Sequence, residues 1–187
     1  MDTKSLIIEI STTLFQQKGY IGVGLNEILK ACNISKGSLY HHFPNGKEEL
    51  LVACLERLKE NITEDMKDIF QRYSTAPEAT LAMIEQLITN LETEGTITGY
   101  TFSSIVSEMG SLSDNIRHAC AQLYHQIQDI YYYKLIEDGY SQKAAYSTAV
   151  MMTATIEGAM MLCLTQKDTE PLRVIARVLP PMLKNMS

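Results

Sequence analysis

Apolar residues recur along this chain at the spacing of α-helices. Over residues 3–18, the positions i, i+4, i+7 and i+8 would share one face of a helix. They are occupied by Ile7, Ser11, Leu14 and Phe15. Gly19 follows and would end that helix. Runs of alternating apolar and polar residues between hairpin turns, typical of β-strands, are not found in the sequence. The pattern therefore predicts an all-α protein.

Helix start and stop signals divide the rest of the chain into eight further helices, about nine in all. Two short helices fall within residues 25–43. Capping residues open longer helices at Asn45, Thr75 and Ser141. The Pro180-Pro181 pair should kink or shorten the last helix. A short segment is expected at 101–109, and the longer helices at about 45–72, 75–94, 111–139, 141–166 and from 170 onward.

Residues 25–50, LNEILKACNISKGSLYHHFPNGKEEL, predict a helix-turn-helix. Asn33-Ile34 would make the turn between two short helices, and Ser35 would cap the second, which runs from Lys36 to about His42. The residues expected to point inward are Ile28, Leu29, Ala31, Leu39 and Phe43. In such a motif the exposed face of the second helix enters the major groove of DNA.

The second helix leaves polar or small residues on the rest of its circumference: Lys36, Gly37, Ser38, Tyr40, His41 and His42. Lys36 can neutralise a phosphate or donate to a guanine edge, and Gly37 has no side chain to keep the backbone from a phosphate. The hydroxyl and imidazole groups can bond to phosphates or base edges. Lys47, in the first turn of the next helix, would add its ammonium to a helix N-terminus.

Charge is distributed unevenly along the chain. The 187 residues carry a net charge of −6, and this excess lies after Leu50, because the first fifty residues hold equal numbers of acidic and basic side chains. No acidic residue lies between Ile28 and Lys47. An acidic body repels a polyanion, so a nucleic-acid contact should come from the first fifty residues. A short solvated helix in an ordinary bundle would not explain this gap in acidic residues.

Motifs for catalysis and metal binding are missing from the sequence. The glycines from Gly19 to Gly24 follow a helix and not a strand, so they are not a dinucleotide loop, and no nucleophile motif occurs. The cysteines are too far apart for a zinc site and are expected to be buried in a reducing compartment. They are Cys32, Cys54, Cys120 and Cys163. We therefore predict a protein that is not an enzyme and needs no metal or cofactor.

Signals for secretion or membrane insertion are also missing. The N-terminus lacks the basic start and long apolar run of a signal peptide. The most apolar window, residues 149–164, is interrupted by polar residues, which favours a buried helix over a membrane span. The protein is expected to be cytoplasmic, with no membrane partner.

The order of these residues resembles a known family. GY, four variable residues, LNEILKACNISKGSLYHHF and then KEEL resemble the TetR family of transcriptional regulators, and PNGKEEL resembles its LmrA/YxaF-type subgroup. Near the end of the chain, IEGAMMLCLTQKDTEPLRVIARVLP resembles the ligand-binding and dimerising domain of that subgroup. The resemblance implies a three-helix DNA-binding domain over residues 1–46 and a helical domain for ligand binding and dimerisation over 47–187. It also implies a homodimeric repressor that binds a palindromic operator in double-stranded DNA and is released by a small-molecule effector.

The resemblance also assigns roles by position. Many relatives have Thr or Ser near the start of the second helix for a phosphate contact, whereas this chain has Val23 and Gly24. The Asn26 side chain or the Gly24 backbone could take that place. The residues that fall on DNA-contact positions of the family are Lys36, Gly37, Ser38, Tyr40, His41 and Lys47.

The C-terminal part is rich in methionine and aromatic residues, which adapt to varied shapes. The resemblance implies an apolar pocket for a planar or multi-ring molecule, and the alternative for each residue is an ordinary core position. The predicted ligand-binding residues are Phe102, Met109, Tyr124, Met152, Ile156 and Met160.

Two helices near the C-terminus are predicted to form the dimer interface. Ala154, Gly158 and Met161 share one helical face and would let two helices approach closely. A second stripe is formed by Leu172, Ile175 and Leu179. Packing both helices against their symmetry mates would form an isologous four-helix interface.

Two other functions remain open from the sequence alone. One is a dimeric DNA-binding factor that responds to no ligand, and the other is an all-helical binding protein that does not contact DNA. Binding to DNA that weakens steeply with salt would favour either DNA-binding function. A ligand that releases the DNA would then select the regulated one.

Overall fold

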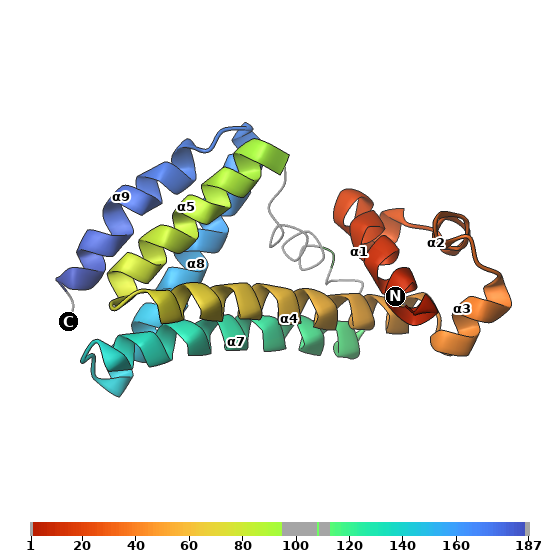
Figure 1. Ribbon diagram of the computed structural model, residues 1–187, viewed down its shortest axis with the longest axis horizontal. Coiled ribbons are helices and arrows are strands. Elements are labelled where there is room, and N and C mark those ends of the chain that lie inside the picture. The colour runs from red at the N-terminus through yellow and green to blue at the C-terminus, as the bar shows by residue number, and fades with distance from the viewer. Residues whose placement is uncertain (1, 95–107, 109–112, 186–187) are drawn as a thin grey trace. The chain divides into compact units, whose positions relative to one another are not determined.

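The computed structural model describes residues 2–94, 108 and 113–185. These residues form eight α-helices and no strand, which confirms the predicted all-α class. The ninth predicted helix, over 101–109, lies outside the described residues apart from Glu108. The helices are α1 (Thr3–Gly22), α2 (Leu25–Cys32), α3 (Lys36–His42), α4 (Lys47–Arg72), α5 (Ala76–Glu94), α7 (Asp114–Glu137), α8 (Gln142–Gln166) and α9 (Glu170–Lys184), as labelled in Figure 1.

The contacts within the chain divide it into two compact units. Among the described residues, the first unit holds 2–61, 108 and 113–122, and the second holds 62–94 and 123–185. Helices α4 and α7 contribute residues to both units. The predicted domain boundary between residues 46 and 47 is a division by role and stays a prediction.

The first unit is built around the buried faces of α1, α2, α3 and the start of α4. Ile28 and Leu39 are fully buried, as predicted, but Ala31 is exposed and Cys32 takes the inward position one residue later. Asn33 makes the turn after α2 in the left-handed conformation, with φ 52° and ψ 47°, which Asn tolerates better than most residues. The other large side chains buried in this unit are Ile7, Phe15, Phe43, Leu50, Leu51 and Leu55.

Two helix ends of the first unit differ from the prediction. Gly19 breaks α1 with φ 70° and ψ 170°, a region open almost only to Gly, but the chain then returns to helix up to Gly22. Helix α4 begins at Lys47, after Gly46 with a positive φ of 71°. The predicted start at Asn45 is thus two residues early, and the Glu49 side chain reaches back to accept from the Asn45 N–H at 2.8 Å.

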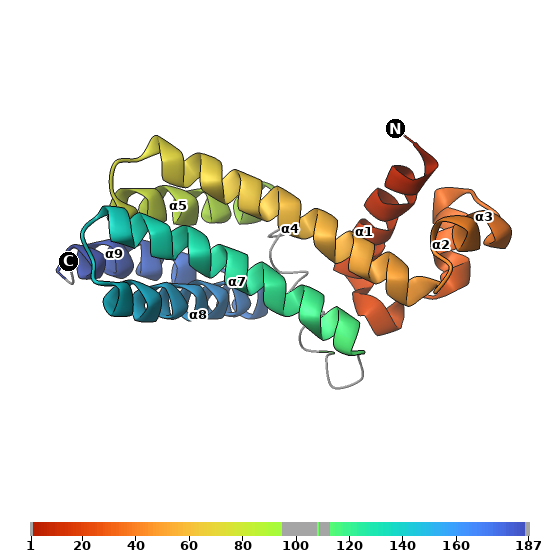
Figure 2. The same cartoon turned by 90° about the horizontal axis from the view of Figure 1, so that it is seen from below.

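The second unit packs α9 against both α5 and α8 (Figure 2). The predicted caps of two of its helices are confirmed, since Ser141 Oγ accepts from the Ala144 N–H at 3.3 Å and Thr75 Oγ1 accepts from the Glu78 N–H at 3.5 Å. Helix α9 continues through the Pro180-Pro181 pair to Lys184, so the pair does not shorten it, and the alternative of a kink stays a prediction. Burial of Leu183 and the hydrogen bond from the Tyr140 hydroxyl to the Leu183 carbonyl hold its last turn in place.

All four cysteines are buried, as predicted, and none is in a disulfide. Burial raises the pKa of the Cys54 thiol to about 12. The thiols therefore stay protonated near neutral pH and serve as small apolar core residues.

One helix of the described residues, α8, is long and apolar enough to span a membrane by length and composition alone. Core helices of globular proteins often meet the same criteria. Nine residues of α8 are buried within the chain, and its opposite face is also largely apolar. The helix is thus apolar on two faces, of which its own chain covers one.

Candidate nucleic-acid interface

Helix α3 is short, is capped at its N-terminus and packs its inner face against the core. The Ser35 side chain accepts from the Ser38 N–H at 3.1 Å, which is the predicted cap. Leu39 and Phe43 are buried beneath the helix. Its outer positions are therefore exposed, as the sequence predicted: Lys36, Gly37, Tyr40 and His41 are exposed, while Ser38 and His42 are half-buried.

Lys36 and Tyr40 lie side by side on the exposed face of α3. The Lys36 ammonium stands 5.8 Å from the centre of the Tyr40 ring. The ring also lies near Gly46, where a Cβ would be in ordinary contact with a ring carbon at 3.4 Å. Glycine at 46 readily adopts the positive φ found there. The two side chains form one unit, so they should be tested together.

The start of α2 offers backbone N–H groups at the place where the resemblance implied a hydroxyl. Gly24 stands at the N-cap with no side-chain cap, and Val23 before it is fully buried in the core. The first N–H groups of any helix lack acceptors within the helix, so a phosphate can bind there. Asn26 is exposed in the first turn. That the Asn26 side chain or the Gly24 backbone binds a phosphate in place of the hydroxyl stays a prediction.

Lys47 is more constrained than the sequence indicated. Its ammonium donates to the Tyr20 carbonyl oxygen at 2.5 Å and lies 4.1 Å from the centre of the Tyr20 ring. Partial burial lowers the pKa of Lys47, and the Glu108 carboxylate opposes that shift. Lysine has three N–H donors, so a phosphate contact by Lys47 stays a prediction. Its observed role is to hold the end of α1.

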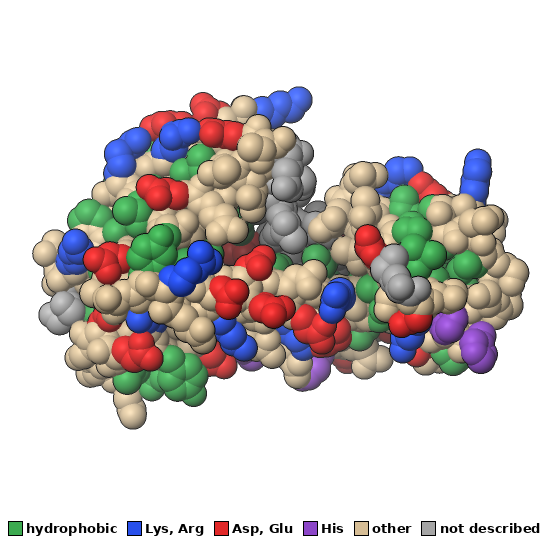
Figure 3. All heavy atoms as spheres, in the orientation of Figure 1, with side chains coloured by type: hydrophobic (Ala, Val, Ile, Leu, Met, Phe, Trp, Pro, Cys, Tyr) green, Lys and Arg blue, Asp and Glu red, His purple; other side chains and the backbone are tan. Residues whose placement is uncertain are grey.

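The charge around α3 suits a polyanion. The described residues from Ile28 to Gly46 include no acidic side chain. Glu27, just before this stretch, pairs with Lys18. On the face that Figure 3 shows, histidine side chains gather over the region that Figure 1 labels α3. A negatively charged ligand bound to this stretch therefore meets lysine side chains, backbone N–H groups and neutral polar side chains, and no carboxylate from the stretch itself.

The cap of α3 can be tested by replacing Ser35 with Ala. We expect the free energy of unfolding to fall by about 1 kcal/mol, and DNA affinity to fall because the first turn, which carries Lys36, frays. Urea denaturation and fluorescence anisotropy with labelled DNA measure the two effects. The matched control is Ser141→Ala, which removes the same kind of cap from α8. An equal loss of DNA affinity in the control would contradict a local role for Ser35.

The predicted ligand-binding residues are only partly described. Phe102 and Met109 lie outside the described residues. Met152, Ile156 and Met160 are buried along one face of α8, and Tyr124 is half-buried on α7. The structure therefore brings three of the six together at a spacing of four residues. Their burial suits a core as well as a closed pocket, so their ligand role stays a prediction.

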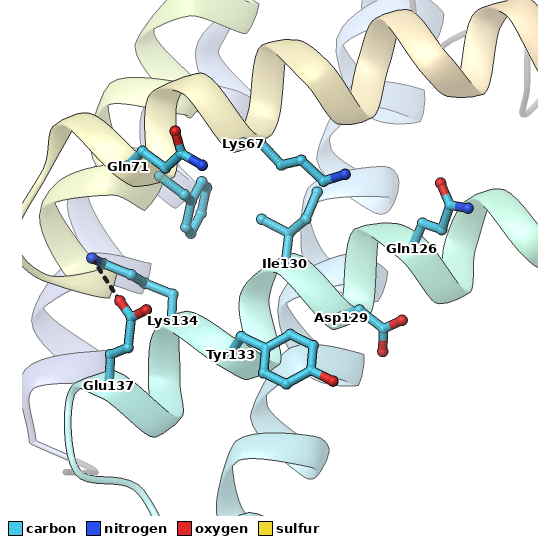
Figure 4. A pocket seen from close by; sticks show the side chains of 9 residues that line it. Lys67, Gln71, Gln126, Asp129, Ile130, Tyr133, Lys134 and Glu137 are labelled. Carbon is cyan, nitrogen blue, oxygen red and sulfur yellow. Dashed lines mark hydrogen bonds and ion pairs between the residues drawn. The ribbon is translucent and has the colours of Figure 1, made fainter.

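A groove that the sequence did not indicate lies between α4 and α7 in the second unit (Figure 4). Its volume is about 650 Å³, and none of the six predicted ligand residues lines it. The Lys134 side chain crosses one end and pairs with Glu137 at 3.2 Å. The lining mixes Phe70 and Ile130 with charged and amide side chains. In the sequence these residues are typical of solvent-exposed helix faces. The groove forms only where α4 and α7 pack side by side.

The predicted dimer residues divide into exposed and buried ones. Ala154, Gly158 and Met161 are exposed on α8. Leu172 and Leu179, in contrast, are 0% and 1% exposed, because this side of α9 packs on α5 and α8 of the same chain. They are core residues, and their assignment to an interface was wrong. Ile175 is half-buried.

Further exposed apolar residues, which the sequence did not single out, extend the α8 surface. On α8 they recur at every fourth position, together with Ala154 and Gly158, and on α9 they follow the same spacing. They are Tyr146, Val150 and Leu162 on α8, and Val174 and Val178 on α9. This set, with Ala154, Gly158 and Met161, is called the α8–α9 apolar stripe below. The four-residue spacing of these exposed residues is visible in the sequence, but the residues of the buried face have a similar spacing. The spacing alone therefore does not tell the two faces apart.

Known proteins share both the sequence pattern and the fold. Residues 7–54 match the family described as bacterial regulatory proteins of the tetR family, and residues 76–178 match the LmrA/YxaF-like C-terminal domain of transcriptional regulators. The HTH-type transcriptional regulator LmrA of Bacillus subtilis is 33% identical over 98% of this chain and 97% of its own. YxaF of the same organism, also named an HTH-type transcriptional regulator, is 31% identical over 98% and 96%.

A solved structure agrees with these matches. The crystal structure of reduced Escherichia coli NemR has a TM-score of 0.86 and 26% identity, covering 100% of this chain and 97% of that one. A likeness over the whole length, together with two family matches, leaves one assignment. The chain belongs to the TetR family of bacterial regulatory proteins, with a C-terminal domain of the LmrA/YxaF-like kind.

Proposed function

We propose that this DNA-binding transcriptional regulator is a repressor that binds a palindromic operator as a homodimer and is released by a small apolar or aromatic molecule. The observation that carries the proposal is the exposed face of α3. Lys36, Tyr40 and His41 stand there on a buried base, in a stretch without acidic residues. A related protein of Escherichia coli, NemR, is named a transcriptional repressor.

The α8–α9 apolar stripe supports a homodimer. Monomeric proteins rarely expose a contiguous apolar surface of this kind, and an isologous interface pairs the same surface on two copies. Two recognition helices held about 34 Å apart would fit successive major grooves on one side of DNA. A two-fold symmetric dimer therefore calls for a palindromic operator.

Ligand release is supported by the methionine-rich interior next to helices that serve both units. Met152 and Met160 are buried on α8 and can adapt to an inserted ring. A ligand that prefers the DNA-incompetent state lowers operator affinity by its coupling free energy, typically about 1 to 3 kcal/mol. Helix α4 begins at Lys47 and has residues in both units, so its reorientation would carry the signal.

Selection of bound sites from random double-stranded DNA tests the proposal. We expect an inverted repeat, bound by a dimer with an affinity that falls steeply as salt is raised. A panel of planar aromatic compounds is then added to the complex. No selected sequence would contradict the DNA-binding role, and DNA binding that no compound weakens would favour the ligand-independent factor.

A further inference from the structure

The carboxylate of Glu108 lies against the break in α1. Its Oε2 accepts from the Ile21 N–H at 3.0 Å. Its Oε1 stands 2.1 Å from where a Cβ would lie if Gly19 had a side chain. Glycine leaves room for the carboxylate where it now stands, and only glycine readily adopts the φ and ψ found there.

Lys47 contacts the same short turn. Its ammonium bonds the Tyr20 carbonyl oxygen and lies over the Tyr20 ring. Its charge is also close enough to that of Glu108 for the two to interact. Three segments that are far apart in the sequence thus meet at residues 19–22, within the first unit.

This turn leads directly into the DNA-binding motif. After it come Val23, which is fully buried, and Gly24, the N-cap of α2. Lys47 is the first residue of α4. A shift of the turn would therefore move the starts of two helices that frame α3.

Glu108 comes from a different part of the sequence. It lies within the region that matches the C-terminal domain, whereas the turn and Lys47 lie within the region that matches the N-terminal one. In sequence it is adjacent to Met109, one of the predicted ligand-binding residues. Through this hydrogen bond the C-terminal region directly contacts the segment that leads into the DNA-binding motif.

We propose that Glu108 is a positioning residue for DNA binding: its carboxylate holds the Gly19–Gly22 turn and Lys47, and thereby the starts of α2 and α4, in the DNA-binding arrangement. The inference rests on the proposed function and adds a point of regulation to it. Whatever moves residue 108 would change operator affinity without touching DNA.

Operator affinity of two variants tests this role. Glu108→Ala should weaken binding about tenfold, because a hydrogen bond to a charged group is lost at the turn. Glu108→Gln should fall between Glu108→Ala and the native chain, since its amide oxygen can still accept from the Ile21 N–H. Removing a negative charge by itself would strengthen binding to a polyanion. The direction of change therefore separates positioning from simple charge.

The matched control is Glu85→Gln, which makes the same charge change at an exposed position of α5. We expect it to leave operator affinity unchanged or slightly raised. Hydrogen exchange of the Ile21 amide is the second readout, and it needs no DNA. It should be faster in Glu108→Ala than in the control, while the exchange of the second unit stays the same.

The results separate the positioning role of Glu108 from the proposed function as a DNA-binding repressor. Native protein that binds DNA, with Glu108→Ala and Glu108→Gln that bind it equally or more tightly, would overturn the inference and leave the proposed function standing. Native protein that selects no DNA would overturn both. If Glu108→Ala does not fold, Glu108→Gln decides: weaker binding supports the role, and native or tighter binding overturns it.

Discussion

Replacing Lys36 and Tyr40 together by Ala should weaken operator binding about 100-fold, since a well-placed base-edge contact is worth about 1 to 3 kcal/mol and both side chains are removed. The Lys36 ammonium and the Tyr40 ring form a stacked pair on the exposed face of α3. Losing one phosphate-neutralising lysine should also reduce the slope of log affinity against log salt by about 1. Fluorescence anisotropy over a salt series measures both quantities.

The matched control for this pair is Lys67→Ala with Tyr133→Ala. The same two residue types are removed, with the same change of charge, from the groove between α4 and α7. Operator affinity should stay within about twofold of native. Stability should change little in either double variant, because substitutions at exposed positions usually alter it by less than about 0.5 kcal/mol. A folded Lys36, Tyr40 double variant with native affinity would refute α3 as the recognition helix.

Charge placed in the α8–α9 apolar stripe should dissociate the proposed homodimer. Ala154→Glu combined with Val178→Glu brings four carboxylates to an isologous interface, since each change occurs in both copies. Burying an unpaired charge costs several kcal/mol, so we expect dimer dissociation to rise by at least about 1000-fold. Operator binding should fall with it, because a monomer grips only one half-site. Sedimentation velocity measures the assembly state, and anisotropy measures the binding.

An exposed apolar residue elsewhere supplies the control. Tyr73 follows α4 outside the stripe and is 41% exposed, so Tyr73→Glu should leave the dimer intact. Val178 is 54% exposed within its own chain, so its replacement should not unfold the protomer. Leu179→Glu, by contrast, should unfold it, because Leu179 is a core residue. A stripe variant that stays dimeric would move the interface to another surface.

The DNA-binding motif could be predicted because its signals are local. Ser35 can cap only the helix that follows it, and Asn33 suits a left-handed turn wherever it stands. Burial of Leu39 and Phe43 four residues apart then leaves Lys36 and Tyr40 outside. Each step depends on neighbours within one or two helical turns, so the sequence carries the whole argument.

The C-terminal helices were harder to interpret because their faces look alike. Helix α9 has one stripe through Leu172 and Leu179 and another through Val174 and Val178. Both are apolar with helical spacing, and periodicity does not say which partner a face meets. In the structure α5 and α8 bury the first stripe and leave the second exposed.

By itself, the sequence determined the all-helical class, the family, the turn and caps of the DNA-binding motif, and the exposed face of α3. These follow from backbone preferences and apolar spacing, which act over a few residues. Only the tertiary structure decided which face of α9 is core, that α4 and α7 enclose a groove, and that the Glu108 carboxylate accepts from the Ile21 N–H. The last contact joins atoms 87 residues apart in the chain. Such contacts depend on how distant helices pack, and no local pattern encodes that.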